Sequence, residues 1–241
     1  KTTAKLKLSI VTPVYNDWPS FSRLLEELDK TISNENVELC ILAVNDASTY
    51  EYDLVKDKAT ELKFINKLEI LNLSCNLGHQ RAIAIGLADI VNRYNFDAVI
   101  VMDSDGEDDP SNLPALINEY RIKKNQIIVA RRDKRSEGNL FKISYLFYKF
   151  LFRFFTGTKI SFGNYCLIPF EVLKRLIYNE NLWNNLPATI LRSKIPLSMI
   201  STKRGKRYVG KTNMNFRGLV IHGLSAVAVY GDIALLRVLS V

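Results

Sequence analysis

The chain has 241 residues, of which 47% are hydrophobic, so it can bury the core of one α/β domain with a C-terminal extension, and disorder is excluded. Its three cysteines are odd in number and lack a Cys-x-x-Cys spacing, which argues against a disulfide framework or a zinc site and favours a reducing compartment. The net charge of +8 is divided unevenly: residues 1–110 carry 11 Lys and Arg against 19 Asp and Glu, and residues 111–241 carry 22 against 6. We therefore expect the second half to meet an anionic lipid or lipid phosphate, and not nucleic acid, since no nucleic-acid motif is present.

Taken in chain order, the hydrophobic pattern predicts strands that alternate with helices. The predicted strands are residues 6–12, ended by Pro13, then 37–44, 68–73, 98–102 and 126–130, and the predicted helices are 20–32, 52–64, 80–94 and 111–124. This alternation predicts an α/β fold with a mostly parallel sheet covered by helices on both faces. Ligands of such sheets bind in the crevice at the carboxyl ends of the strands, so chemistry is expected there.

The most informative segment is Asp103-Ser104-Asp105, where the fourth apolar run passes into a loop. Alternate strand residues point to one face, so both carboxylates can face one site and hold a divalent cation that binds a diphosphate. Glu107 and two further aspartates extend this acidic loop. The alternative is a solvated acidic turn.

The second half contains two segments with amphipathic or apolar character. In residues 140–155, Lys142, Lys149 and Arg153 fall on one helical face and aromatic and aliphatic side chains on the other, as in a membrane-interface helix, the alternative being a helix packed on the sheet. Residues 216–241 are apolar but interrupted by charges, so they do not read as a spanning helix. They predict a second interfacial helix, a lead-in to transmembrane segments, or a buried core helix.

Polar loops follow the predicted strands in a recognisable order. They are Pro13-Val-Tyr-Asn16, Asn45-Asp-Ala-Ser48, Asn76-Leu-Gly78 with Ala82 and Gly86, and the acidic segment that ends at Pro110. Because of these motifs, the chain resembles the family 2 glycosyltransferases of GT-A fold, and the resemblance covers nearly the whole chain. Within this family it is most similar to the polyprenyl-phosphate glycosyltransferases, such as dolichol-phosphate mannose synthase and the bactoprenol-phosphate glucosyltransferases. The resemblance implies a GT-A domain at 1–212, with a nucleotide-binding half 1–110 and an acceptor- and membrane-facing half 111–212, followed by a juxtamembrane helix at 213–241.

The resemblance also implies roles for individual residues. Those implied to bind the donor are Pro13, Tyr15, Asn16, Asp46, Gly78, His79, Gln80, Arg81, Asp103 and Ser104. Those implied to hold Mg²⁺ or Mn²⁺ are Asp103, Asp105 and Glu107, and those implied to receive the acceptor phosphate are Arg132, Arg135, Arg207, Lys211 and Thr212. Asp103, Asp105, Arg132 and Arg207 are expected to be catalytic.

Several of these assignments have alternatives or depart from the family pattern. The alternative role of Asp46 is to cap the next helix. His79 is expected to make a polar contact or to cap a helix, and not to act as a base. Glu107 stands where the dolichol-phosphate mannose synthases commonly have glutamine, and Asn213 stands where the family usually has lysine. These two departures concern the metal ligands and one phosphate contact.

The function implied is inverting transfer of a sugar from a UDP- or GDP-sugar to a polyprenyl phosphate in cell-envelope glycan synthesis. It is expected at the cytoplasmic face of the inner membrane, the chain being peripheral or anchored by transmembrane segments after residue 241, and a homo-oligomer is left open. One alternative is extension of a glycan at a hydroxyl acceptor, for which Asp108 or Asp109 would be the base. A second is a membrane-bound protein that binds a nucleotide sugar without turnover.

Overall fold

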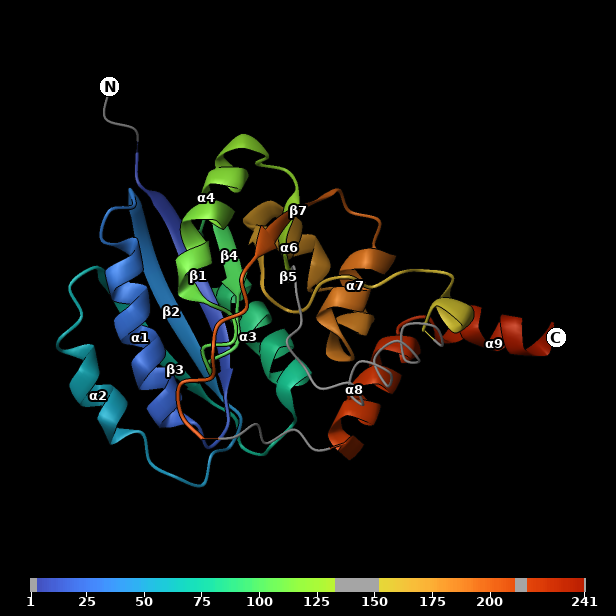
Figure 1. The fold of residues 1–241 in the computed structure, drawn as a ribbon, viewed down its shortest axis with the longest axis horizontal. Helices are drawn as coiled ribbons and strands as arrows, with labels where there is room; N and C mark the ends of the chain where they lie inside the picture. The colour runs from blue at the N-terminus through green and yellow to red at the C-terminus, as the bar shows by residue number, and fades with distance from the viewer. Residues whose placement is uncertain (1–3, 133–151, 211–215, 241) are drawn as a thin grey trace.

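The computed structural model describes residues 4–132, 152–210 and 216–240, which form a seven-stranded sheet in the order β3-β2-β1-β4-β6-β5-β7 (Figure 1). The strands are β1 (Leu6–Val14), β2 (Val37–Asn45), β3 (Ile65–Asn72), β4 (Ala98–Val101), β5 (Ile127–Arg132), β6 (Cys166–Pro169) and β7 (Leu197–Thr202). Only β6 runs against its neighbours, β4 and β5, and the other pairings are parallel. The predicted α/β fold with a mostly parallel sheet is confirmed.

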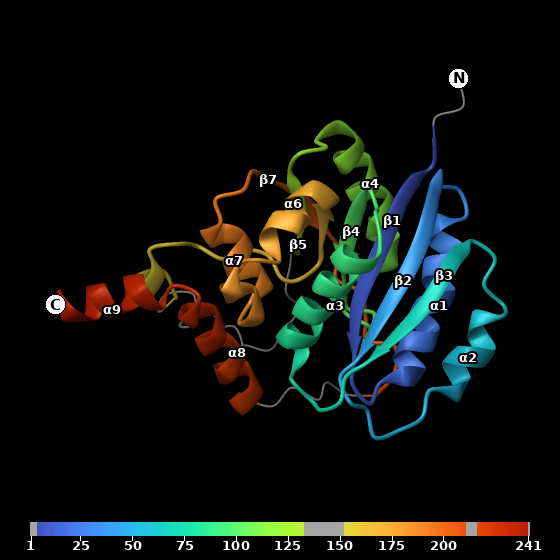
Figure 2. The ribbon, with the colours of Figure 1, turned by 180° about the vertical axis from the view of Figure 1, so that it is seen from behind.

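Helices cover both faces of the sheet. They are α1 (Trp18–Ile32), α2 (Asp53–Ala59), α3 (His79–Arg93), α4 (Leu113–Ile122), α6 (Phe170–Leu176), α7 (Leu186–Arg192), α8 (Phe216–Ala228) and α9 (Gly231–Leu239), with 3₁₀ turns η1 (Pro110–Asn112) and η2 (Glu180–Trp183). The views from front and back place α1, α2 and α4 on one face and α3, α6 and α7 on the other (Figures 1 and 2). Residues 152–156 are also helical.

The core has two layers because successive strand residues point to opposite faces. Ile10 packs into the cluster under α1 and α4, while its neighbour Val11 packs into the cluster under α3 and α6. Helix α3 approaches the sheet closely at Gly86, where an added Cβ would lie 2.6 Å from Val44 Cγ2 and 2.7 Å from Val11 Cγ1. This close packing holds the first turn of α3 at the carboxyl edge of the sheet.

Strand β1 does not end at Pro13, contrary to the sequence prediction. It continues to Val14, and Pro13 lies opposite Val44 of β2. On the side of β4, the last paired residue of β1 is Val11. Pro13 lies beyond this last pair, so β4 does not need the N–H group that proline lacks. The strand therefore carries Tyr15 and the following loop one step further toward the carboxyl edge.

The C-terminal segment forms two helices and not one. Helix α8 packs against α7 through a small cluster with Ala188, Ala226 and Val229, whereas no side chain of α9 is buried. Arg192 of α7 holds the start of α9 through two 2.8 Å hydrogen bonds to Asp232, and α9 extends away from the body (Figure 1). Within the described residues, no helix has the length and apolarity that a membrane crossing requires.

Candidate active site

The acidic loop after β4 is the centre of the candidate site. Its backbone turns at Gly106, which has a φ of +90°, a conformation that favours glycine. The Asp105 carboxylate accepts the backbone N–H of Glu107 at 2.9 Å, and the buried Asp108 carboxylate accepts the N–H of Asp103 at 3.0 Å. The loop thus folds on its own carboxylates, and Asp103 and Asp105 lie at the carboxyl end of β4 as predicted.

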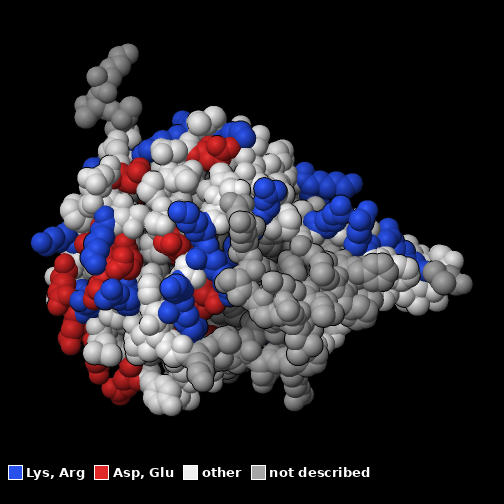
Figure 3. All heavy atoms as spheres, viewed as in Figure 1, with Lys and Arg blue, Asp and Glu red and all other residues white. Residues whose placement is uncertain are grey.

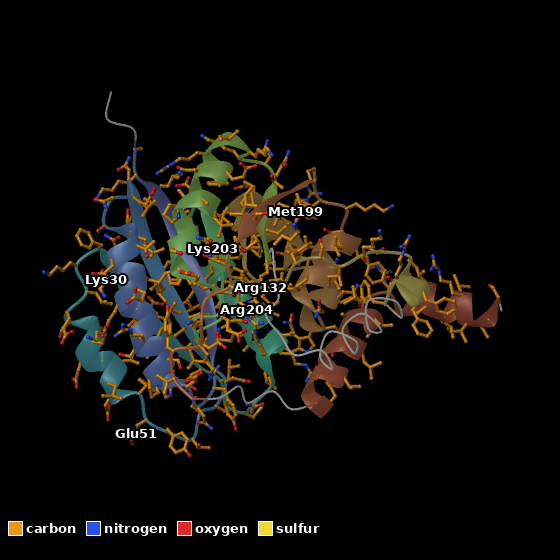
Figure 4. The ribbon with its side chains drawn as sticks, viewed as in Figure 1. Lys30, Glu51, Arg132, Met199, Lys203 and Arg204 are labelled. Carbon is orange, nitrogen blue, oxygen red and sulfur yellow. The ribbon has the colours of Figure 1, made fainter. Side chains whose placement is uncertain are left out.

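Three arginines from the second half of the chain pair with these carboxylates. Arg132, at the end of β5, donates to Asp108 at 2.9 Å, and Arg204, which follows β7, donates to Glu107 at 2.6 Å. Arg207 donates to Asp105 at 2.8 Å. Figure 4 shows the labelled Arg132 and Arg204 close together near the centre of the molecule, as their shared neighbour Glu107 requires.

Residues 203–209, which we call the strap, lie directly on the acidic loop. The N–H of Gly205 donates to the Glu107 carbonyl at 3.0 Å, and the N–H of Tyr208 donates to the Asp105 carbonyl at 2.9 Å. The Tyr208 ring covers Gly106, where an added Cβ would lie 2.5 Å from Cε2 of the ring. Beside the strap, an open groove of about 750 Å³ runs along α1. The strap therefore covers the acidic loop and lines this groove.

The same strap also reaches the loop after β1. Arg207 pairs with Asp17 as well as with Asp105, so one guanidinium joins two loops of the first half. Both Asp17 and Arg204 were missed by the sequence analysis. The signal that could have found Arg204 is the run of four cations at 203, 204, 206 and 207, which has few carboxylates nearby in sequence.

Crowded carboxylates set the electrostatics of the site. Burial, together with the charges of Asp108 and Asp105, raises the pKa of Asp103 well above its usual value. Burial also raises the pKa of Asp105 and of Asp108, against the opposing effect of hydrogen bonds and the nearby arginines. Burial by itself lowers the pKa of Arg132, but the ion pair with Asp108 outweighs this effect, so the pKa of Arg132 is raised. The site favours added positive charge.

His79 and Asp103 approach each other at this edge. His79 Nε2 lies 2.9 Å from Asp103 Oδ1, and His79 is the first residue of α3, preceded by Gly78 with a φ of +89°. The N-terminal end of a helix carries a partial positive charge that suits an anion. His79 therefore lies beside Asp103 at this end of the helix, and its role toward a donor stays a prediction.

Asp46 fastens the loop that precedes α3. Its two carboxylate oxygens accept the backbone N–H groups of Leu77 at 2.7 Å and Gly78 at 2.9 Å, and its side chain is buried. Burial raises its pKa while these two hydrogen bonds lower it. These contacts fix the loop that leads into α3. They are not the predicted cap of the next helix, because the N-terminus of α2 has no side-chain cap hydrogen bond, and the expected role of Asp46 in donor binding stays a prediction.

Other residues expected to bind the donor have partners within the protein. Asn16, with a φ of +50°, accepts the Thr49 N–H at 2.8 Å, which ties the loops after β1 and β2 together. Gln80 donates to Asn164 and accepts the Leu186 N–H at 2.8 Å, so it links α3 to α7. The remaining members lie as follows: Arg81 Cζ is 5.9 Å from the Trp183 ring, Tyr15 is 45% exposed, Ser104 is buried and Pro13 lies within β1.

The donor set suits a divalent cation in part. Asp103 and Asp105 offer hard carboxylate oxygens, and Mg²⁺ is commonly held by one or two carboxylates together with substrate phosphates. In the described part of the chain, however, no three His, Cys, Asp or Glu side chains converge at ligand spacing. Each of the three expected ligands lies beside a basic group of the protein: Glu107 is 2.6 Å from Arg204, Asp105 is 2.8 Å from Arg207 and Asp103 is 2.9 Å from His79. The ligand set therefore stays a prediction.

Three residues expected at the acceptor phosphate, Arg135, Lys211 and Thr212, lie outside the described residues, as do Lys142 and Lys149 of the predicted amphipathic helix.

Comparison with known proteins agrees with this geometry. The family model for Glycosyl transferase family 2 matches residues 9–177. The chain is 32% identical to the uncharacterized glycosyltransferase YkcC of Bacillus subtilis over 157 residues, 61% of this chain and 44% of that protein. It is 26% identical to the prophage bactoprenol glucosyl transferase homolog of Escherichia coli over 243 residues, 93% of this chain and 73% of the relative. The chain thus spans less than half the length of YkcC.

Among solved structures, the chain resembles glucosyl-3-phosphoglycerate synthase from Mycobacterium tuberculosis in complex with Mn²⁺, UDP-glucose and phosphoglyceric acid. The TM-score is 0.66 at 11% identity, and the match covers 95% of this chain and 80% of that one. This likeness shows the GT-A fold. Because the family model covers more than half of the sequence and carries the site loops after β1 to β4, the chain belongs to glycosyl transferase family 2.

Proposed function

We propose that this chain transfers a sugar from a nucleotide-diphosphate sugar to a polyprenyl phosphate, with inversion at the sugar and with a divalent cation, at the cytoplasmic face of the inner membrane. The observation that carries the proposal is the meeting of an acidic edge from the first half of the chain with arginines from the second. Five carboxylates face three arginines there: Asp17, Asp103, Asp105, Glu107 and Asp108 against Arg132, Arg204 and Arg207. The excess of negative charge suits a cation, and the arginines suit phosphates.

The relatives support the choice of substrates. An Escherichia coli homolog is named as a bactoprenol glucosyl transferase, and a Rhizobium johnstonii relative, 26% identical, as a dodecaprenyl-phosphate galacturonate synthase. A polyprenyl phosphate is already anionic near neutral pH, given a second phosphate pKa of about 6, so its attack needs no strong base. The proposal extends the activities for which these relatives are named to this chain.

The chain's own residues have the following parts. Asp103 and Asp105 would hold Mg²⁺ or Mn²⁺, which when bound would offset the charge of the departing diphosphate. Arg132 and Arg207 would present guanidinium groups to phosphate oxygens, which they match in a bidentate way. His79 and the N-terminal end of α3 would contact the donor while α3 keeps its place through Gln80. Charge stabilisation would be the main contribution to catalysis.

The site disfavours the alternative hydroxyl acceptor, which needs a base. Asp108 is buried and engaged by Arg132 and by the Asp103 N–H, and Asp109 accepts the Ser111 N–H at 2.8 Å. Asp108 is therefore occupied, whereas Asp109 lines the open groove beside the strap. A hydroxyl acceptor therefore remains the second candidate.

The C-terminal part would bring the site to the membrane. Helix α9 exposes Leu235, Leu236 and Leu239, and the face shown in Figure 3 carries basic side chains toward α9 and a mixture of acidic and basic ones over α1 and α2. Apolar side chains flanked by cations suit the interface of an anionic bilayer. We accordingly assign residues 1–212 to the transferase domain, with a donor half at 1–110 and an acceptor half at 111–212, and residues 213–241 to the juxtamembrane part.

Transfer of label from UDP- and GDP-sugars, with Mn²⁺, to undecaprenyl phosphate or to a hydroxyl acceptor tests the proposal. We expect labelled lipid, loss of at least about a hundredfold in rate in Asp105→Asn, and normal transfer in Asp53→Asn, an exposed aspartate of α2. Label found only on the hydroxyl acceptor would establish the second candidate. Nucleotide-sugar binding without any release of nucleoside diphosphate would indicate a binding protein.

A further inference from the structure

The strap is fastened to the acidic loop by one residue in particular. Glu107 accepts a hydrogen bond from Arg204 at 2.6 Å through its side chain, and it accepts the Gly205 N–H at 3.0 Å through its backbone carbonyl. The next residue, Asp108, forms an isolated antiparallel bridge with Arg204. Side-chain and backbone contacts of Glu107 therefore point to the same strap segment.

The contact is fitted at the level of the backbone. An added Cβ at Gly205 would lie 2.0 Å from the Gly106 carbonyl oxygen, so only glycine allows the two chains to approach this closely. Two residues further on, the strap delivers Arg207 to Asp105. Docking at Glu107 thus determines where the Arg207 guanidinium lies.

From this geometry we infer that Glu107 and Arg204 form a latch that docks the strap, and that Glu107 is a positioning residue and not a ligand of the divalent cation. Its carboxylate is turned to Arg204 and Arg132, at 2.6 and 3.8 Å, and among the described residues no three His, Cys, Asp or Glu side chains lie at ligand spacing. A cation held by two carboxylates and a diphosphate needs no third carboxylate. The latch stands on the contacts alone; the statement about the cation rests on the proposed function.

Cleavage by chymotrypsin after Tyr208, followed by mass spectrometry, measures opening of the strap without any substrate. We expect Glu107→Gln and Arg204→Gln each to raise the rate of this cleavage by roughly fivefold to tenfold, because a charge-assisted hydrogen bond is lost. The double variant should be no faster than either single one, since both changes remove the same interaction. The charge exchange Glu107→Lys with Arg204→Glu should restore slow cleavage.

Two further variants complete this test. Gly205→Ala should open the strap without altering any charge. Arg121→Gln removes an arginine of α4 that is paired with Glu35, and this change should leave the cleavage rate unchanged. Additive effects of the two single changes, or unchanged cleavage in both, would overturn the latch.

Direct titration of Mn²⁺ in the presence of UDP separates a latch from a ligand. We expect Glu107→Ala to keep the Mn²⁺ affinity within about threefold of the native chain, while Asp105→Ala weakens it by about tenfold or more. An equal loss in both variants would make Glu107 a ligand and overturn the inference. If the native chain binds no Mn²⁺, the cation part of the proposed function fails, and the cleavage experiment still decides the latch.

Discussion

Asp103 combines a functional position with an unfavourable charge. Its carboxylate is crowded by Asp108 and Asp105, so its pKa in the folded chain is raised above the unfolded value. A group of this kind binds more protons in the folded state, so its contribution to stability is present below the unfolded pKa and is lost as pH rises through the folded pKa. Without a cation, the native chain should therefore become less stable over that interval.

The first prediction concerns Asp103→Asn. At neutral pH without metal, the variant should melt at a higher temperature than the native chain, by about 2–4 °C for each kcal/mol gained in a chain of this size. The difference should shrink on acidification, as the native Asp103 becomes protonated, and turnover should be lost throughout. Differential scanning calorimetry from pH 5 to 8 checks this, and a lower melting temperature at neutral pH would contradict it.

The second prediction, also for a single residue, concerns Gln80. Replacing it by Ala removes the hydrogen bonds to Asn164 and to the Leu186 N–H, so the first turn of α3 loses its tie to α7. Loss of buried or half-buried partners costs about 1–3 kcal/mol, which should appear in urea denaturation. A normal free energy of unfolding combined with a raised KM for the nucleotide sugar would instead support the role in donor binding that the sequence suggested.

At the scale of elements, the packing of α3 on the sheet leaves no room at Gly86. The third prediction is that Gly86→Ala destabilises the chain by about 1–3 kcal/mol, because the new methyl group meets Val44 and Val11 at less than 3 Å. Gly231, at the start of α9, has no atom within 4 Å of an added Cβ, so Gly231→Ala should leave stability unchanged or raise it slightly. Thermal melts of both variants make the comparison, and equal melting temperatures would refute the packing argument.

Most elements as far as β5 could be predicted from the sequence, although α2 ends at Ala59 and not at residue 64, whereas β6, α6, α7 and β7 could not be predicted. The spacing of apolar residues and the apolar runs in the sequence predict both ends of β2 and α3 to within one residue, because parallel strands and their helices alternate regularly. The short antiparallel β6 and the helices α6 and α7 have 4 to 7 residues each and depend on long-range pairing, which no local pattern encodes.

The site shows the same division. The polar loops were predictable because they follow strands, but ion pairs such as Arg204 with Glu107, 97 positions apart, depend on tertiary structure. The orientation of Glu107 toward Arg204 also follows from this tertiary contact. The position of the polar loops at the sheet edge could thus be predicted, while the contacts of Asp46 and Gln80 depend on the tertiary structure.

For the whole molecule, the extension of α9 from the body gives the fourth prediction. Replacing Leu235, Leu236 and Leu239 by Ser should weaken binding to vesicles that contain anionic lipid, because exposed apolar side chains supply insertion energy. Leu54→Ser on α2, where the leucine is 63% exposed, is the matched control and should bind normally. Vesicle sedimentation at two salt concentrations measures both contributions, and unchanged binding of the triple variant would remove α9 from the proposed membrane contact.

The single reversed strand has a consequence for how relatives with this sheet can diverge. Because β5 ends and β6 begins at the carboxyl edge, the stretch 133–165 departs from and returns to the same rim. A change in the number of residues between these two strands leaves the strand register of the sheet intact. Relatives that share this sheet can therefore differ in the connection between β5 and β6 while they keep the same scaffold.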